Sequence, residues 1–358
     1  MARLARIMAT LAFLALMLAG LGFVTVHLAG PAGGRIAAQA SVRGVLDGSL
    51  AARLDQSVVA ALPRLQGLED MVSGLAYRTL GDAGPQVRAG CPGWLFLAEE
   101  LLETRDGAAH LAARITLAAR IKAAVEARGA ALVVLPVPDK ADLSRETLCG
   151  LAVSAQARGR AAAWRRQSAG LGLDQVDIAA DWPTGAFLRT DTHWNDDGAA
   201  FAAHRVAEHV IRRLGPGGEP ASVVVGEPKD RIGDLMRLAG LARSWPWSGP
   251  QPDRQPDVST AFTRTGGLLD DVPAPTVLLA GSSYSRNSGF LDYLQDALDR
   301  EVAQKSQDGG GFAGPLLDIL AREPDLLSQT RLVVWEFPMR VLTQPLTPAE
   351  RTFLGDDK

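Results

Sequence analysis

Uninterrupted runs of apolar residues mark the predicted strands of this chain. They lie at 131–137 (ALVVLPV), 276–280 (TVLLA) and 332–335 (LVVW), with a weaker run at 176–180. Because polar residues do not alternate with the apolar ones, each strand is expected to be buried on both faces, as in a parallel sheet covered by helices. Segments of helical pattern lie between the runs, at 110–128, 198–214 and 290–303. The pattern predicts one doubly wound α/β domain.

The N-terminus has a different pattern. Arg3 and Arg6 precede residues 7–34, which contain no formally charged side chain. A membrane-spanning helix needs about 20 apolar residues, whereas a signal peptide usually has an apolar region of about 7 to 15. We therefore expect residues 1–34 to be a signal-anchor, with cleavage after the small residues 38–40 (AQA) as the alternative. On either interpretation the positive-inside rule places the rest of the chain outside the cytoplasm.

The remaining chain divides into three predicted parts. Residues 35–85 are rich in Leu, Ala and Arg with helical spacing and are predicted to form a helical stalk. The main folded domain is predicted over 86–345, and its first strand, 94–97, follows a turn sequence. Residues 346–358 are predicted to be a C-terminal tail. Within the domain, residues 244–275 are rich in Pro, Gly, Ser and Asp, which predicts a long surface loop.

Composition and charge argue against a disordered chain and against a nucleic-acid-binding protein. With 358 residues, of which 47% are hydrophobic and 22% charged, the chain has a globular rather than a disordered composition. Its formal net charge of -3 provides no basic field, so we expect no nucleic-acid partner. Cys91 and Cys149 suit an exported chain in which they close one disulfide, and two buried free thiols are the alternative.

The turn after the apolar run at 276–280 carries the candidate nucleophile. Ligands of parallel α/β sheets bind at the carboxyl ends of the strands. At that end the chain reads GSSYS, residues 281–285, between a predicted strand and a predicted helix. This context exposes a serine hydroxyl together with backbone N–H groups. By itself the motif is more typical of a serine-rich turn that caps a helix.

A second motif contains the groups that a serine nucleophile needs. Asp191 and His193 lie two residues apart in RTDTHWN, residues 189–195. A serine hydroxyl needs an imidazole to accept its proton and a carboxylate to orient the imidazole. A zinc site of Asp191, His193 and His204 is the alternative, but the ligand pair with helical i, i+4 spacing found in zinc hydrolases is missing. We therefore expect neither a metal nor another cofactor.

Five short motifs in one order give a family resemblance. They are GWLF (93–96), PDK (138–140), TDTHW (190–194), GSSYS (281–285) and WEFP (335–338). Together they resemble the alginate O-acetyltransferase family of the AlgJ and AlgX type. The chain ends soon after the last motif, so it looks more similar to the AlgJ kind. The resemblance implies an SGNH-hydrolase-like, flavodoxin-like domain with three α/β/α layers and a parallel sheet, preceded by an N-terminal membrane helix.

The resemblance also implies roles for individual residues. Ser283 becomes the nucleophile, with Ser282 and Ser285 as the alternatives. His193 becomes the general base and Asp191 its orienting partner. Four further residues match family positions and are expected to bind substrate, with core packing as the alternative for the two aromatic ones: Lys140, Trp194, Tyr284 and Glu336.

The implied function is O-acetylation of an exported polysaccharide, alginate or another exopolysaccharide, through an acetyl-serine intermediate. The expected location is the periplasm, with the N-terminal helix anchored in the inner membrane. Expected partners are the acceptor polysaccharide, a multi-spanning membrane O-acyltransferase that relays acetyl groups, and the polysaccharide synthesis and export machinery. A carbohydrate acetylesterase with the same triad and a non-catalytic assembly protein are the alternatives. On the predicted surface loop, Trp245 and Trp247 are expected either to stack on sugar rings or to cover the edge of the core.

Overall fold

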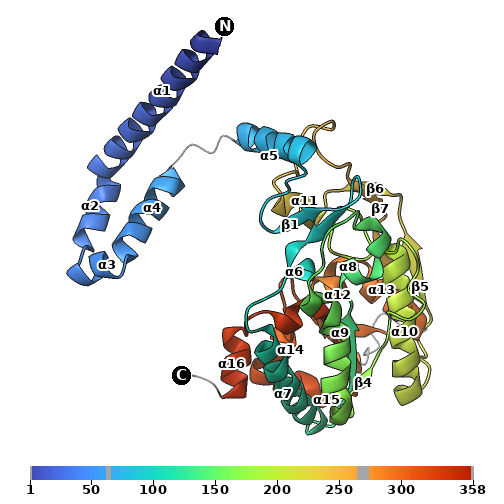
Figure 1. Ribbon diagram of the computed structural model, residues 1–358. Coiled ribbons are helices and arrows are strands. Elements are labelled where there is room, and N and C mark those ends of the chain that lie inside the picture. The colour runs from blue at the N-terminus through green and yellow to red at the C-terminus, as the bar shows by residue number, and fades with distance from the viewer. Residues whose placement is uncertain (1, 62–65, 264–273, 356–358) are drawn as a thin grey trace. The chain divides into compact units, whose positions relative to one another are not determined.

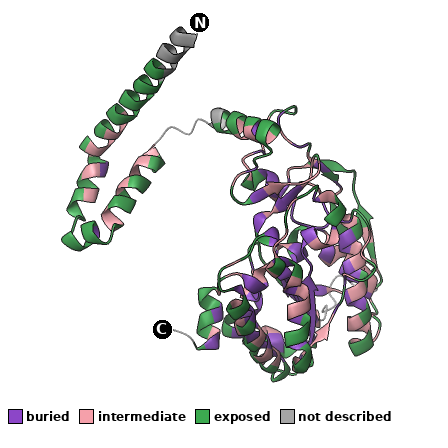
Figure 2. Cartoon of the chain, viewed as in Figure 1, coloured by how far each residue is buried: buried purple, intermediate pink, exposed green. Residues whose placement is uncertain are grey.

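The computed structural model describes residues 2–61, 66–263 and 274–355, which form two compact units, Met1–Gln66 and Gly67–Lys358 (Figure 1). The first unit contains α1 (Ala2–Ala29), α2 (Pro31–Ala38), α3 (Val42–Leu46) and α4 (Ser49–Ala61). Its residues are mostly exposed or half-buried, whereas buried residues fill the second unit (Figure 2).

The predicted membrane anchor is bent. Among the described residues no single helix is long and apolar enough to cross a membrane, but Phe13–Ala29 and Pro31–Ala38 together meet the requirement as a pair bent by 64°. The bend lies at Gly30, which is extended, and at Pro31, whose ring cannot continue the hydrogen-bonding pattern of α1. Membrane anchoring therefore stays a prediction.

The last helix of the predicted stalk packs in the second unit. Helix α5 (Gln66–Leu80) contacts the segment that follows α11 (Asp234–Leu238). A side chain at Gly74 would come within 2.5 Å of Ser248 Oγ, and Asp70 forms an ion pair with Arg243 at 3.3 Å. The helical content expected for residues 35–85 is present, but it is divided between the two units.

A five-stranded parallel sheet forms the centre of the second unit, with the strand order β10-β9-β11-β3-β4. The strands are β3 (Ala131–Val137), β4 (Asp174–Gln175), β9 (Val277–Gly281), β10 (Val302–Ser306) and β11 (Leu332–Pro338). Every residue of β9 and β11 is buried. This burial explains why their sequences are apolar without alternation and confirms the predicted parallel α/β sheet.

Helices cover both faces of this sheet. Along β3, Leu132 and Val134 face one hydrophobic core, and Val133 and Leu135 face the other. The first core includes residues of α7 (Gly107–Glu126), α9 (Ala155–Ser168), α14 (Gly314–Arg322) and α15 (Pro324–Gln329). The second includes residues of α10 (Asp196–Leu214) and α13 (Phe290–Leu298). The predicted three-layer arrangement is therefore present.

The predictions were wrong at the two edge strands. Strand β4 lies at Asp174–Gln175 rather than at 176–180. The helix expected to reach residue 303 ends at Leu298, because Asp299 adopts a left-handed conformation, and the missed strand β10 follows. Strand β4 has only two residues and β10 is only partly buried, so neither has the apolar run that revealed the central strands.

Short antiparallel pairs lie outside the main sheet. They are β1 (Val87–Ala89) with β2 (Leu95–Leu97), β5 (Ala221–Val225) with β8 (Val258–Phe262), and β6 (Lys229–Arg231) with β7 (Asp253–Gln255). Two of these strands, β7 and β8, lie within the predicted surface loop 244–275, of which residues 264–273 are outside the described residues. Short helices α6 (Ala98–Leu101) and α8 (Lys140–Leu143) follow β2 and β3.

Two long-range links close the second unit. Cys91 and Cys149 form the disulfide that was one of the two predicted outcomes, at a sequence separation of 58. A disulfide that closes a loop of that size stabilises the folded state by about 4 kcal/mol, because it lowers the entropy of the unfolded chain. In the segment predicted to be a tail, α16 (Pro348–Leu354) packs on α7 through a buried ion pair of Glu350 with Arg114 at 2.9 Å. Residues 356–358 lie outside the described residues.

Candidate active site

The serine turn lies at the carboxyl end of β9. Gly281 ends the strand, and a Cβ there would come within 2.6 Å of both Glu336 Oε2 and Ser285 Oγ, so a larger residue would displace the turn. Ser282 caps the following helix α12 (Ser283–Asn287) by accepting a hydrogen bond from the Tyr284 N–H. Ser283 is thus the first helical residue and, unlike Ser282 and Ser285, is not buried.

A buried carboxylate from β11 distinguishes the three serines. Glu336 accepts hydrogen bonds from the Ser282 N–H at 2.7 Å and from the hydroxyls of Ser282 and Ser285, both at 2.8 Å. Burial raises the pKa of Glu336, and these hydrogen bonds oppose that shift. Glu336 was expected from the sequence to bind substrate. It is 1% exposed and supports the serine turn from behind instead of lining an open surface. Of the three serine hydroxyls, that of Ser283 is the one that forms no hydrogen bond with Glu336.

That hydroxyl meets the imidazole of His193. The distance from His193 Nε2 to Ser283 Oγ is 2.8 Å, across 90 residues of sequence. On the other side of the ring, His193 Nδ1 lies 2.5 Å from Asp191 Oδ1, which also accepts the His193 backbone N–H at 3.1 Å. Because Nδ1 donates to the carboxylate, Nε2 is left as the acceptor for the serine proton. The structure therefore brings Asp191, His193 and Ser283 into one hydrogen-bonded chain.

The hydrogen bonds keep Asp191 ionised. Burial alone raises the pKa of this carboxyl, but the hydrogen bonds and charge of His193, with a contribution from Arg231, outweigh burial and lower the pKa well below its usual range. An ionised carboxylate at this position stabilises the imidazolium that forms when His193 accepts a proton.

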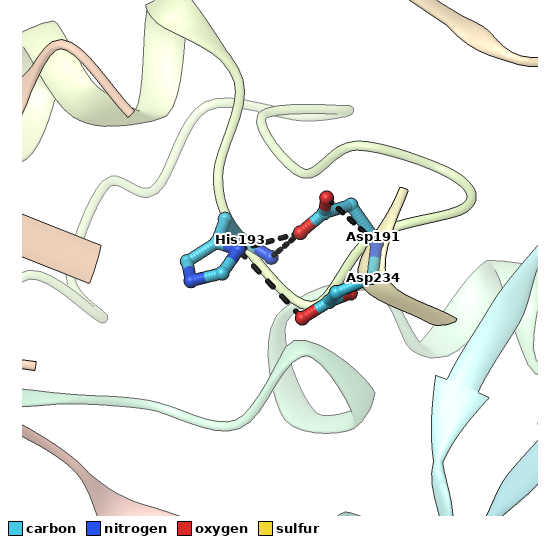
Figure 3. A group of neighbouring side chains, drawn as sticks. All are labelled: Asp191, His193 and Asp234. Atoms are coloured by element: carbon cyan, nitrogen blue, oxygen red, sulfur yellow. Dashed lines mark hydrogen bonds and ion pairs between the residues drawn. The ribbon is translucent and has the colours of Figure 1, made fainter. Parts of the chain in front are cut away.

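A second carboxylate, Asp234, lies beside this pair and was missed in the sequence. Figure 3 shows both carboxylates on the Nδ1 side of the ring, with Asp234 Oδ2 3.8 Å from His193 Nδ1. The Asp234 N–H donates to Asp191 Oδ2 at 3.0 Å, and its carboxylate accepts the Thr192 N–H at 2.7 Å and the Thr192 hydroxyl at 2.5 Å. The first residue of α11 thus fixes the loop that carries Asp191 and His193.

These three side chains are also a conceivable metal site. One ligand atom from each of Asp191, His193 and Asp234 lies within 4.8 Å of the others. However, both oxygens of each carboxylate accept an N–H or O–H hydrogen bond. The 2.5 Å separation of Nδ1 and Oδ1 suits a shared proton, whereas an ion held at about 2.0 to 2.2 Å from each atom would need them farther apart. The geometry favours a proton relay.

Lys140 lies behind the same loop. Its Nζ is fully buried and donates to the backbone carbonyls of Leu95, Arg189 and Asp191 at 2.7, 3.0 and 2.9 Å. Burial lowers the pKa of this ammonium group to about 8. All three donors of Lys140 are occupied, so it links β2 to the loop that carries Asp191 and His193, called here the histidine loop. The substrate contact expected from the sequence does not fit this burial.

The two aromatic residues of the motifs are buried in the core. Tyr284 donates its hydroxyl to the Thr192 carbonyl at 2.6 Å, and its ring packs edge-on against His193 with 4.8 Å between ring centroids. Trp194 packs against Tyr284 at 4.9 Å and is fully buried. Of the two interpretations made from sequence, packing therefore fits these residues. They join the histidine loop to the serine turn.

Comparison with known proteins gives the same family at every level. The family described as "SGNH hydrolase-like domain, acetyltransferase AlgX" matches residues 87–339. The probable alginate O-acetylase AlgJ of Pseudomonas putida is 29% identical over 312 residues, covering 83% of this chain and 81% of its own. AlgJ of Pseudomonas aeruginosa is 29% identical over 326 residues, with coverages of 83% and 81%.

Solved structures agree with the sequence matches. The O-acetyltransferase domain of Pseudomonas putida AlgJ superposes with a TM-score of 0.64 at 27% identity, covering 76% of this chain and 100% of that domain. Pseudomonas aeruginosa AlgX shares the fold, with a TM-score of 0.55 at 19% identity over 75% of this chain and 67% of its own. Because the family match spans most of the second unit, the chain belongs to the SGNH hydrolase-like family of the acetyltransferase AlgX and is an O-acetyltransferase.

Proposed function

We propose that this enzyme transfers acetyl groups to an exported polysaccharide, alginate or a related exopolysaccharide, through an acetyl ester on Ser283. The observation that carries the proposal is the continuous hydrogen-bonded chain from Asp191 through His193 to Ser283 at the carboxyl end of the sheet. The names of the relatives, alginate O-acetylases, support the class of acceptor.

In the first half-reaction, Ser283 Oγ attacks the carbonyl carbon of an acetyl ester donor while His193 Nε2 takes the hydroxyl proton. Asp191 holds the Nδ1–H and stabilises the imidazolium. The C–O bond of the donor then breaks, and His193 returns the proton to the leaving oxygen. As the first residue of α12, Ser283 has a backbone N–H without an intrahelical acceptor. Such a donor typically stabilises the oxyanion by about 3 to 4 kcal/mol.

In the second half-reaction, a sugar hydroxyl attacks the acetyl-serine. His193 takes the proton of that hydroxyl and delivers it to Ser283 Oγ as the serine leaves. Acetyl transfer is complete, and the enzyme is regenerated without net proton change. Water in place of the sugar gives the esterase reaction with the same groups.

We assign the reaction to the periplasmic side of the inner membrane. Apolar side chains are exposed along α1, for example Leu16 and Val26, and the bent helix pair has the length and composition of a span. The disulfide of Cys91 and Cys149 suits an oxidising compartment. A periplasmic site needs an acetyl supply from the membrane, so we propose a multi-spanning O-acyltransferase and the polysaccharide synthesis and export machinery as partners.

Acceptor-dependent partitioning tests the proposal. The full chain in detergent is incubated with a chromogenic acetyl ester, with and without deacetylated alginate oligosaccharides, and the sugars are analysed by mass spectrometry. Transfer predicts acetylated oligosaccharide at the expense of free acetate. Acetate release that the acceptor does not divert identifies an esterase, and a chain inactive in both assays points to the assembly role.

The role of Asp191 makes a prediction about pH. Its pKa is lower in the folded chain than its ordinary value of 3.8, so below that pH the unfolded chain binds the proton more readily and stability falls. We expect Asp191→Asn to be less stable than wild type by about 1.5 to 3 kcal/mol near neutral pH. Urea unfolding at a series of pH values should show this gap unchanged above about pH 4 and narrowing below it. A gap that widens on acidification would contradict the assignment.

A further inference from the structure

A pair of adjacent indole rings is exposed to solvent. Trp245 and Trp247 are 54% and 58% exposed, and their ring centroids are 5.5 Å apart at an interplanar angle of 48°. The other five tryptophans of the chain are buried or half-buried. Indole carries a large apolar face and one N–H donor, so two rings left side by side in water have the character of a binding surface.

The turn that carries these rings is fixed. The Trp245 carbonyl accepts hydrogen bonds from the Ser248 N–H at 2.8 Å and the Ser248 hydroxyl at 3.1 Å, and Gln251 donates to the Pro246 carbonyl at 2.7 Å. Ser248 is 3% exposed and packs on Gly74 of α5. The backbone that carries the two rings is therefore ordered before any ligand binds, which lowers the entropy cost of binding.

The segment that follows the two tryptophans contacts the histidine loop. Shortly after Trp247, Asp253 accepts hydrogen bonds from the backbone N–H groups of Arg189 and Thr190 at 3.1 and 2.8 Å and from the Thr190 hydroxyl at 2.7 Å. Thr190 directly precedes Asp191. The indole pair and the proposed triad are thus connected through one set of backbone contacts.

We infer that Trp245 and Trp247 form a subsite for the acceptor polysaccharide, in which sugar rings stack on the indole faces while another sugar of the same chain reaches Ser283. The inference rests on the proposed function. Sugar rings suit the site because they present flat C–H faces bordered by hydroxyls, which match indole in apolar area and hydrogen bonding. On the same turn Pro246 is exposed, while Ser244 and Gly249 are half-buried. We choose a sugar chain as the occupant because the turn continues into Asp253, which holds the backbone of Arg189 and Thr190 next to the proposed triad.

Dependence on acceptor length tests this subsite. In the full chain, Trp245→Ala/Trp247→Ala is expected to lower kcat/KM for long alginate oligosaccharides about tenfold, through KM, because two stacking contacts are lost. Acetylation of the shortest oligosaccharides and hydrolysis of a chromogenic ester should stay unchanged. Trp245→Phe/Trp247→Phe should restore most of the preference for long acceptors. The matched control is Val224→Ala/Val225→Ala, at apolar positions of β5 that are 52% and 57% exposed.

A binding measurement separates this inference from the proposed function. In native gels cast with alginate, the wild type should be retarded and the double alanine variant should not. If the chain transfers no acetyl group but its retardation still depends on the two indoles, the subsite stands and the proposed function is overturned. Equal retardation and an unchanged length dependence overturn the subsite. The subsite is also overturned if the double alanine variant differs from the wild type only in its binding to vesicles of phosphatidylglycerol and phosphatidylethanolamine. That result would identify the indole pair as a membrane contact.

Discussion

Replacing Ser283 by alanine is expected to lower acetyl transfer by at least about a thousandfold while the fold stays intact. The hydroxyl removed is the group 2.8 Å from His193 Nε2, and its side chain is not part of the buried core. Transfer to oligosaccharides and release of acetate from a chromogenic ester should fall together, since both pass through the same acyl-serine. Circular dichroism and the melting temperature should match the wild type.

The neighbouring serines provide the matched controls. Ser285→Ala removes one hydrogen bond to Glu336 and should slow turnover without abolishing it, because the nucleophile remains. Ser288→Ala removes a buried hydroxyl that has no hydrogen-bond partner in the described part of the chain, so it should retain wild-type activity. If Ser283→Ala keeps substantial transfer while Ser285→Ala loses it, the nucleophile has been assigned to the wrong residue of the turn.

Lys140→Met is expected to destabilise the second unit by about 3 to 5 kcal/mol, because three backbone carbonyls lose a hydrogen-bond donor and each buried acceptor left unsatisfied costs about 1 to 3 kcal/mol. Methionine has a similar length but no donors, so the carbonyls of Leu95, Arg189 and Asp191 lose their shared partner. Denaturant unfolding monitored by tryptophan fluorescence measures the change. Activity should fall even where the variant is fully folded, because the Asp191 carbonyl is one of the three acceptors.

The control for this substitution is Lys122→Met on α7. Lys122 is partly exposed and pairs with Glu126 on the same helix, so its loss should change stability by less than about 1 kcal/mol. Lys140→Arg should also be less stable than the wild type, since a guanidinium does not fit a fully buried ammonium site. Stability equal to wild type in Lys140→Met would show that the buried ammonium does not hold the histidine loop.

Local patterns in the sequence were sufficient for the central part of the fold. Strand β3 was predicted at its observed limits, 131–137, because a strand buried on both faces must be apolar throughout. The pairing of Asp191 with His193 was equally accessible, since two residues of one loop are close in any fold. The order of the short motifs then indicated the family that the comparisons show.

Contacts between distant segments could not be read from the sequence. Asp234 is 43 residues from Asp191 and has no motif of its own, so only folding reveals that it holds the histidine loop. Lys140 and Glu336 lie in recognisable motifs, but their burial depends on elements far away in the chain. The sequence therefore indicated which residues matter, while the tertiary structure decided which of them support the turn and the loop from behind.

The reason lies in the range of the interactions. Apolar runs, helix caps and neighbouring acid and base residues act over a few positions. By themselves they predicted the three central strands, the helices α7, α10 and α13, and the Asp191–His193 pair. The hydrogen bond from Ser283 to His193 spans 90 residues and depends on the parallel sheet bringing the two loops to one edge. Which serine faces the imidazole was decided only there, because the carboxylate of Glu336 occupies the hydroxyls of Ser282 and Ser285.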